Sequence, residues 1–255
     1  MEAPATRLIL RLVDDEAGRR AVYRLRYDVF VDELGGGGPL VDHDARLERD
    51  RFDPFCDHLA LFDPALPPGE DAVAVYRLMR DDAAREGIGF YSAGEYDLTP
   101  LERSGRRLLE FGRSCVRPDY RGGEALFRLW KGLADYVDSH ASEILFGVAS
   151  FHGTDPAALA HPLSFLHARH LAPPDLRVRA TGPAAQRMDL LAPEAIDRRR
   201  AVEAMPPLLK SYLRLGGMVG DGAWIDRQFN TVDVCLIVDA ARLSNRAQQL
   251  YRSLE

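Results

Sequence analysis

The segment 108–151 constrains the fold most, because it reads as a strand, a turn, a helix and a second strand. Apolar residues dominate 108–116 and 144–151, a proline- and glycine-containing turn covers 118–123, and apolar residues recur at helical spacing across 125–139. A helical crossover of this kind makes the two strands parallel and covers one face of their sheet. The segment therefore predicts an α/β protein built around a βαβ unit.

The flanking sequence adds strands on both sides of this unit. The alternation at 7–13 predicts a strand, and Asp14 and Asp15 are suited to begin a helix that ends before Gly35–Gly38, four glycines expected in a mobile loop. Further elements are predicted in order: strands at 58–62 and 72–79 joined as a hairpin, a helix at 157–168, a strand at 177–180, a helix at 201–215, a strand at 232–238 and a helix from 241. We expect a mixed sheet flanked by helices.

Composition excludes several classes of protein. Apolar residues make up 46% of the 255 residues, enough for a core, but no run approaches the roughly 20 apolar residues of a membrane-spanning helix. The N-terminus lacks the basic and then apolar layout of a secretory signal. The three cysteines are far apart and form no metal or disulfide pattern. We expect a cytoplasmic protein.

Charge is distributed unevenly along the first half of the chain. The net charge of −6 argues against nucleic acid as a partner. Residues 28–57 carry nine carboxylates against three arginines, whereas 103–131 carry eight cations against three carboxylates. Solvated surface charge would explain both segments. The alternative is that the basic segment docks an acidic partner.

Several blocks of sequence resemble the ornithine-acyl-carrier-protein N-acyltransferases. These blocks follow in order along nearly the whole chain: Leu25–Gly35, Asp50–Asp53, Cys56–Leu59, Tyr76–Leu78, Gly89–Ser92, Glu95–Leu98, Leu109–Val116, Leu145–Phe151, Pro206–Lys210 and Phe229–Val234. The resemblance implies a GNAT-like acyltransferase fold. It also implies transfer of a 3-hydroxyacyl chain from acyl carrier protein to the α-amine of L-ornithine, the first step of ornithine lipid synthesis.

Part of the same pattern also resembles the acyl-homoserine-lactone synthases. The shared residues are Arg26, Phe30, Asp50, Asp53, Arg77, Glu110 and Arg113. An enzyme of the same fold with another amine acceptor, such as glutamine, glycine, lysine or S-adenosylmethionine, is therefore the alternative function. A third hypothesis is that the protein is a non-catalytic module that binds the carrier protein or a lipid. We expect one GNAT-like domain with a core over 1–155 and a C-terminal extension over 156–255 that completes the sheet.

The turn after the first strand of the βαβ unit is the expected donor site. GNAT enzymes that use coenzyme A hold its pyrophosphate with a glycine-rich loop. Here the corresponding stretch begins at Tyr120 and carries Glu124, which would repel a pyrophosphate. We therefore expect a donor with one phosphodiester, the 4′-phosphopantetheine of acyl carrier protein. The donor site is assigned to Cys115, Val116, Arg121, Gly122 and Gly123, and carrier docking to Arg117, Arg121, Arg128 and Lys131.

Amide formation from a thioester requires a base, because an ammonium group has no free lone pair with which to attack the carbonyl. Glu110 lies within a predicted buried strand and is the first candidate, although it could equally neutralise a nearby arginine. Backbone N–H groups near 114–116 could stabilise the tetrahedral intermediate. Ser150 could position a reactant, or serve only as a local hydrogen-bond partner, and His152 is a rival acid or base.

The acceptor site should offer carboxylates to an ammonium and an arginine to a carboxylate. Asp50, Asp53 and Asp57 supply the carboxylates, and Asp50 and Asp53 are also assigned to the catalytic group. Arg26 or Arg77 supplies the arginine, and Arg113 is a further substrate-binding candidate. The remaining candidates are Phe30 for substrate binding and, as alternatives for the acceptor, Asp226, Asn230 and Asp233. The glycines at 35–38 could act as a lid.

No permanent cofactor or metal site is expected, because the seven histidines show no zinc-ligand spacing and no dinucleotide fingerprint occurs. The amphiphilic product predicts peripheral contact with the inner membrane, for which the segment 201–215 is a candidate surface. Core packing would also explain that segment.

Overall fold

The computed structural model describes residues 8–121 and 123–240, and the chain divides into two compact units. One unit combines Met1–Ile88 with Phe111–His140, and the other combines Gly89–Glu110 with Ala141–Glu255. Strand β5 (Leu108–Val116) contributes to both, because it changes unit after Glu110. The expected single domain stays a prediction.

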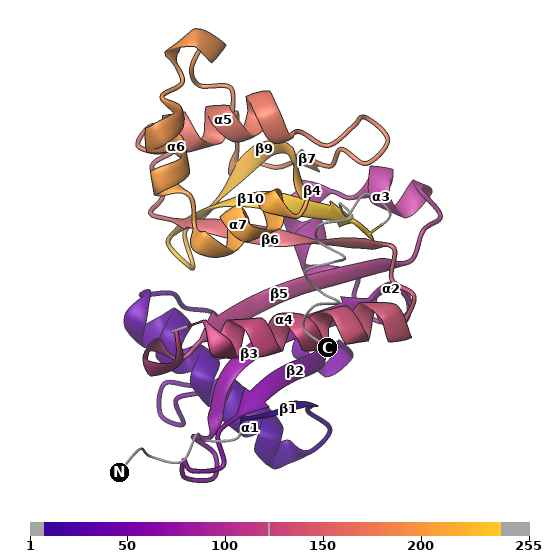
Figure 1. Ribbon diagram of the computed structural model, residues 1–255, viewed down its shortest axis with the longest axis vertical. Helices are drawn as coiled ribbons and strands as arrows, with labels where there is room; N and C mark the ends of the chain where they lie inside the picture. The colour runs from indigo at the N-terminus through magenta and orange to yellow at the C-terminus, as the bar shows by residue number, and fades with distance from the viewer. Residues whose placement is uncertain (1–7, 122, 241–255) are drawn as a thin grey trace. The chain divides into compact units, whose positions relative to one another are not determined.

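The first unit holds one end of the sheet, in the order β1-β2-β3-β5 (Figure 1). Strand β1 (Ile9–Leu12) pairs antiparallel with β2 (Asp57–Phe62), which pairs antiparallel with β3 (Ala72–Arg80). The predicted hairpin is thus confirmed. The shorter elements of the first unit are η2 (Asp53–Phe55), α2 (Asp81–Glu86) and η4 (Pro118–Tyr120).

Helix α1 (Glu16–Arg26) covers one face of this sheet. Asp15 begins the helix as predicted, since its carboxylate accepts a hydrogen bond from the Gly18 N–H at 2.6 Å. Val22 and Leu25 pack against Ala60. The helix continues as a π-helical segment, η1 (Tyr27–Glu33), and the helical run ends before the glycines, as expected.

Helix α4 (Glu124–Ser139) covers the opposite face. A Cβ built on Gly132 would overlap the Leu10 side chain and lie 3.2 Å from that of Leu59, so only glycine permits this close approach. Leu59 and Ala60 are neighbours on β2 and point to opposite faces. The first unit is therefore a helix–sheet–helix sandwich.

The second unit holds the order β5-β6-β10-β9-β7-β4, with β8 (Ala185–Gln186) paired to β9. The first residues of β5 pair in parallel with β6 (Ile144–His152), as predicted for the βαβ unit, and the ladder ends at Glu110. The other strands are β10 (Thr231–Asp239), β9 (Met218–Asp226), β7 (Arg179–Ala180) and β4 (Tyr96–Asp97). The helices are η3 (Tyr91–Gly94), α3 (Thr99–Arg103), α5 (Ala160–His170), η5 (Pro193–Ala195), α6 (Arg198–Ala204) and α7 (Pro207–Arg214).

One predicted helix was wrong. The segment 201–215 forms two helices, α6 and α7, because Pro206 disfavours a helical conformation at Met205, which is extended with φ −69° and ψ 139°. Pro207 then occupies the first turn of α7, where its missing N–H costs nothing. The helix predicted from 241 lies outside the described residues. None of the helices within 8–121 and 123–240 combines the length and apolar character needed to span a bilayer.

Candidate active site

Arg26 lies at the centre of a buried ion cluster in the first unit. It is fully buried at the end of α1, and its guanidinium binds Glu48 at 2.5 Å through Nε and Asp53 at 2.6 Å through Nη1. His58 lies 3.1 Å from the same Asp53 oxygen, and Arg77 lies 3.4 Å from it. The structure thus brings together Arg26, Asp53 and Arg77, three of the residues that the sequence analysis assigned to the site.

Asp50 and Arg113 form the accessible edge of this ion cluster. Asp50 binds Arg77 at 2.6 Å and Arg113 at 3.0 Å, and the Asp50 side chain is 20% exposed, the highest value in the cluster. Arg113 also lies 3.4 Å from Glu48. Arg113 adopts φ +48° within β5, an uncommon conformation for a residue other than glycine. This irregularity directly precedes residues 114–116, whose backbone N–H groups are the predicted stabilisers of the tetrahedral intermediate.

Charges in the ion cluster compensate one another. Three arginines face three carboxylates, and burial lowers the pKa of His58, which favours its neutral form. Burial opposes ionisation of Asp53 and Glu48, but their hydrogen bonds and the neighbouring guanidinium groups, that of Arg26 foremost, together outweigh it and hold the pKa of both carboxyls below the usual range. Arg77 and Arg113 together do the same for the pKa of Asp50. The cluster is a self-neutralised unit, so direct substrate binding by Arg26 would require displacing an internal partner.

Two members of the ion cluster were missed by the sequence analysis. Glu48 lies in a stretch rich in charged residues, where nothing distinguishes a buried carboxylate from a solvated one, and yet it is 1% exposed. His58 is the first residue of the predicted strand 58–62, and the pattern of apolar residues in that strand does not indicate a charged neighbour. The available signal was that Arg26 falls on the apolar face of its helix, which requires buried carboxylate partners.

Two predicted substrate-binding residues, Asp57 and Phe30, lie elsewhere in the first unit. Asp57 binds Arg80 at 2.8 Å and accepts a hydrogen bond from the Tyr136 hydroxyl at 2.6 Å, so it belongs to a separate, half-exposed group. Phe30 is partly buried and packs on the core beneath α1.

Glu110 is held in the second unit by the turn η3. Its carboxylate accepts hydrogen bonds from the Tyr91 N–H at 2.8 Å, the Ser92 N–H at 2.7 Å and the Ser92 hydroxyl at 2.5 Å. Glu110 is 6% exposed. Three donors on a buried carboxylate stabilise its ionised form, which is the form that a general base requires.

Ser150 shares a sheet face with Glu110. Strand register places Glu110 beside Phe146, and Ser150, four residues further along β6, beside Asp233 of β10. Residues paired across strands, and those two apart within a strand, point to the same face. The candidate base, the exposed Ser150 and Asp233 thus lie on one face of the second unit.

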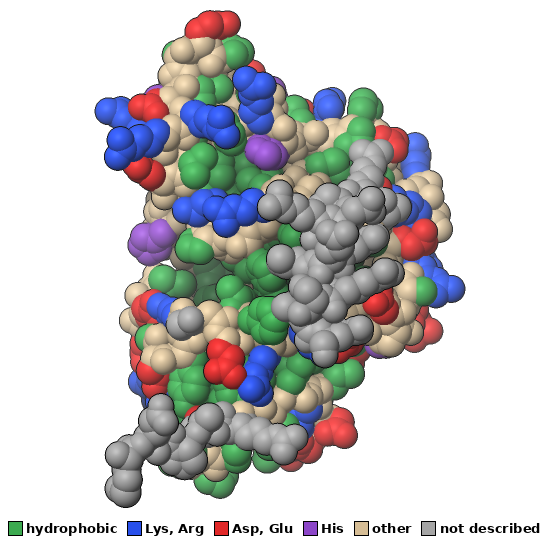
Figure 2. All heavy atoms as spheres, in the orientation of Figure 1, with side chains coloured by type: hydrophobic (Ala, Val, Ile, Leu, Met, Phe, Trp, Pro, Cys, Tyr) green, Lys and Arg blue, Asp and Glu red, His purple; other side chains and the backbone are tan. Residues whose placement is uncertain are grey.

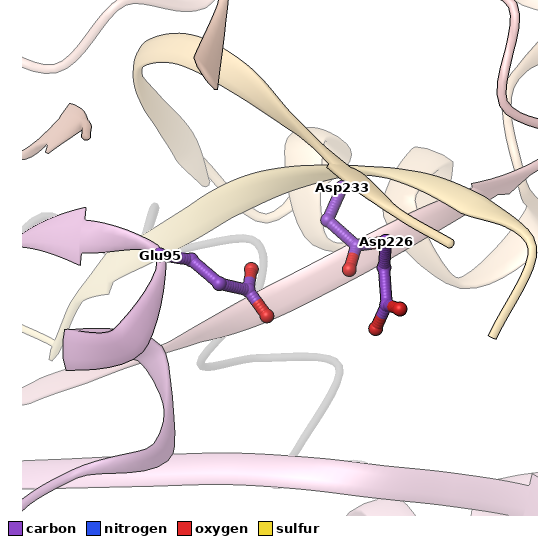
Figure 3. Close-up of side chains that lie close together, drawn as sticks. All are labelled: Glu95, Asp226 and Asp233. Atoms are coloured by element: carbon purple, nitrogen blue, oxygen red, sulfur yellow. The ribbon is translucent and has the colours of Figure 1, made fainter. Parts of the chain in front are cut away.

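Three buried carboxylates gather in the second unit (Figure 3). Oxygens of Glu95, Asp226 and Asp233 lie within 4.8 Å of one another, and each residue is at most 6% exposed. Asp226 also accepts hydrogen bonds from the N–H groups of Gln228 and Phe229. Such an acidic triad suits a cation, either a metal ion or an ammonium. Asp226 and Asp233 were alternatives in the sequence analysis, Glu95 was missed, and Asn230 caps the β9–β10 turn with φ +54°.

The predicted donor loop is already tied to its surroundings. Arg121 makes a bidentate ion pair with Glu33 of η1, at 2.7 and 2.6 Å. The Tyr120 hydroxyl donates to Asp63 at 2.5 Å. Burial raises the pKa of Cys115 to about 12, so this thiol is no nucleophile. Val116 ends β5, Gly123 precedes α4 with φ +107°, and Gly122 lies outside the described residues.

Two of the other predicted docking cations are also engaged. Arg117 lies 3.0 Å from Asp119, and Arg128 binds Glu124 at 2.8 Å and the Leu8 carbonyl at 2.9 Å. Lys131 is half-buried on α4. Three of the four predicted docking cations are therefore already paired with carboxylates of this chain.

Comparison with known proteins agrees with this architecture. Residues 25–131 match the acetyltransferase (GNAT) domain family. The solved structure of a CoA-dependent acyl-homoserine lactone synthase, BjaI, is similar, with a TM-score of 0.54 over 97% of this chain and 89% of that chain at 11% identity. The fold is therefore that of the GNAT acyltransferases, as the sequence resemblance implied.

Two relatives define the family more narrowly. The L-ornithine N(alpha)-acyltransferase of Rhodobacter capsulatus is 60% identical over 95% of this chain and 93% of its own length. The protein of the same name from Brucella abortus is 46% identical over 96% of this chain and 88% of its own length. The chain belongs to the L-ornithine N(alpha)-acyltransferase family.

Proposed function

We propose that the protein transfers a 3-hydroxyacyl chain from acyl carrier protein to the α-amine of L-ornithine, giving a lyso-ornithine lipid. The observation that carries the reaction type is the buried Glu110 carboxylate, which accepts three hydrogen bonds. Membership of the L-ornithine N(alpha)-acyltransferase family supports ornithine as the acceptor.

Glu110 acts as the general base in this proposal. It removes a proton from the α-ammonium, and the freed lone pair attacks the thioester carbonyl to form a C–N bond. Collapse of the tetrahedral intermediate breaks the C–S bond, the pantetheine thiolate takes up the second proton, which leaves the nitrogen as the amide forms, and Glu110 releases the first proton to solvent. In this proposal the buried ion cluster around Arg26 stabilises the first unit and does not contact ornithine. The supporting observation is that the Arg26 guanidinium is already paired with Glu48 and Asp53.

The acidic triad is proposed to receive the side-chain ammonium of ornithine. Its three carboxylates lie on or beside the face that carries Ser150, in the same unit as Glu110. Glu95 directly follows η3, the turn whose first N–H groups hold Glu110. One short turn therefore connects the residue that deprotonates the α-amine with one that recognises the other end of the substrate.

The donor is proposed to be a carrier protein and not coenzyme A. Tyr120 is bound to Asp63, and Arg121 is neutralised by Glu33, so the loop offers little excess positive charge to a group with several phosphates. A single phosphodiester needs less positive charge for its binding than the several phosphates of coenzyme A. The prosthetic group arrives on its carrier, and no permanent cofactor is proposed.

The direct test offers purified protein 3-hydroxyacyl-acyl carrier protein or the matching acyl-CoA, with ornithine. Released thiol and the mass of the product are followed. L-Norvaline, which is ornithine without the side-chain amine, and lysine, glutamine and glycine serve as acceptor controls. We expect carrier-dependent thiol release and mono-acylated ornithine. Turnover only with another amine would assign a different acceptor, and turnover only with acyl-CoA would overturn the donor.

A further inference from the structure

A cavity of about 670 Å³ in the second unit is used by none of this chemistry. It lies between α5 and the segment that contains η5 and the start of α6. Phe165, Pro193 and Ile196 provide apolar lining, and His167, Arg169 and Arg198 provide basic lining. No carboxylate of the described residues lines it.

The two arginines of this basic cavity are electrostatically uncompensated. Among residues 8–121 and 123–240, neither Arg169 nor Arg198 forms a salt bridge or a side-chain hydrogen bond. The carboxylate nearest to Arg198 in sequence, Asp197, is occupied, because it accepts the N–H groups of Arg199 and Arg200 at the start of α6. His167 lies 3.8 Å from Asp221.

A second cavity has the opposite electrostatic character. This cavity of about 680 Å³ beside α1 is lined by three arginines and five carboxylates. Its arginines are paired, as Arg46 is with Asp28 at 2.6 Å. Of these two cavities in the described part of the chain, only the basic cavity combines an apolar lining with guanidinium groups that lack an anion.

We propose that the basic cavity binds the head group of an anionic phospholipid at a bilayer surface. Guanidinium groups bind phosphate in a bidentate manner, and an apolar lining accommodates the glycerol and the upper part of an acyl chain. Figure 2 shows basic side chains gathered over α5 and α6 with hydrophobic side chains between them. The surface lies outside the segment 201–215 that the sequence suggested.

Vesicle flotation tests this assignment. Purified protein is mixed with vesicles of phosphatidylcholine alone or with added phosphatidylglycerol, and the floating fraction is measured. We expect binding only when phosphatidylglycerol is present. The double variant Arg169→Glu/Arg198→Glu should reduce the partition coefficient at least about 10-fold, since each of the two basic residues near an anionic surface contributes a factor of about 5. Ile196→Asp should also weaken binding while leaving both arginines in place.

A charge-matched variant controls for non-specific attraction. Arg179→Glu/Arg187→Glu makes the same change in net charge at two exposed residues that are paired with Asp221 and Asp189. Equal losses in both double variants, or equal flotation of the unmodified protein with the two kinds of vesicle, would overturn the proposal. So would binding of inorganic phosphate as strong as binding of the vesicles, which would indicate a soluble anion. Acyl transfer from soluble carrier protein should be unchanged in these variants, so the proposed function is tested separately.

Discussion

Ser92 donates two hydrogen bonds to one carboxylate oxygen of Glu110, from its backbone N–H at 2.7 Å and from its hydroxyl at 2.5 Å. Because both donors come from one residue, the position of the Glu110 carboxylate depends on the turn η3. The same turn ends next to Glu95, a member of the acidic triad. Displacement of this turn should therefore affect proton transfer and acceptor recognition together.

Replacing Glu110 tests the base. Glu110→Gln should lower kcat by about 10²- to 10⁴-fold, because it removes the proton acceptor. Ser92→Ala is the matched variant: it keeps the carboxylate and both N–H donors, and we expect a smaller loss with an altered pH profile of kcat. Thiol release at saturating carrier protein and ornithine provides the measurement. Near-normal turnover by Glu110→Gln would assign the base elsewhere, with His152 next.

Neutralising the acidic triad tests acceptor recognition. Asp233→Asn and Glu95→Gln should each raise KM for ornithine about 10-fold or more, because a charge-assisted contact is lost. The ratio of kcat/KM values for ornithine and norvaline should fall towards one, since norvaline lacks the side-chain ammonium. A variant that slows both substrates equally would show that the triad has a structural role only.

Removing Arg26 should destabilise the fold strongly. Arg26→Met leaves Glu48 and Asp53 buried without their main counter-charge, and we expect a loss of about 3–5 kcal/mol in the free energy of unfolding. Arg46→Met is the control, because Arg46 is 40% exposed and its pairs with Asp28 and Asp32 are screened by solvent, so a much smaller loss is expected. Urea unfolding monitored by circular dichroism measures both. Similar losses in the two variants would contradict the expected difference.

His58 should make stability depend on pH in mildly acidic solution. Burial lowers the pKa of His58 below 6.5, so below that pH the unfolded chain binds a proton that the native state does not. Stability is therefore complete above about pH 6.5 and declines as the pH falls towards the native pKa, by up to about 1.4 kcal/mol per pH unit. His58→Gln should flatten this part of the profile. His152→Gln, at an exposed position, should leave it unchanged.

The pair between Glu33 and Arg121 should compete with the donor. Glu33→Gln frees the guanidinium, so we expect a several-fold lower KM for acyl carrier protein at low salt and a weaker effect at high salt. Arg121→Ala should raise the same KM. If both variants raise it, the ion pair positions the loop, and Arg121 does not contact the carrier directly.

Much of the fold could be predicted because its signals are local. The alternation of β2 and β3, the capping residue Asp15 and the strand–turn–helix pattern from β5 to β6 each lie within a short window. Strand β9 was missed, since Gly220 and Gly222 interrupt its apolar pattern. Both glycines are required there by close packing: a Cβ on Gly220 would lie 2.6 Å from Val178, and Gly222 has φ +88°.

The sites were less predictable because they depend on residues far apart in sequence. Arg26, Asp53 and Arg77 were placed together through the resemblance, but the sequence did not show that their charges cancel. The association of Glu95 with Asp226 and Asp233 links segments about 130 residues apart, and nothing in either segment indicates the other. Long-range pairing of this kind follows from strand register.

Strand β5 has a consequence for dividing this protein. Its residues up to Glu110 belong to one unit and those from Phe111 to the other, and the chain also changes unit after Ile88 and after His140. No single cut separates the two units, and a fragment that ends at His140 would leave Leu108–Glu110 without the β6 strand that pairs with them. Glu110 and Arg113, a member of the ion cluster, thus lie on one continuous strand although they belong to different units. Exchanging the halves of two such enzymes at any single crossover would interrupt at least one unit.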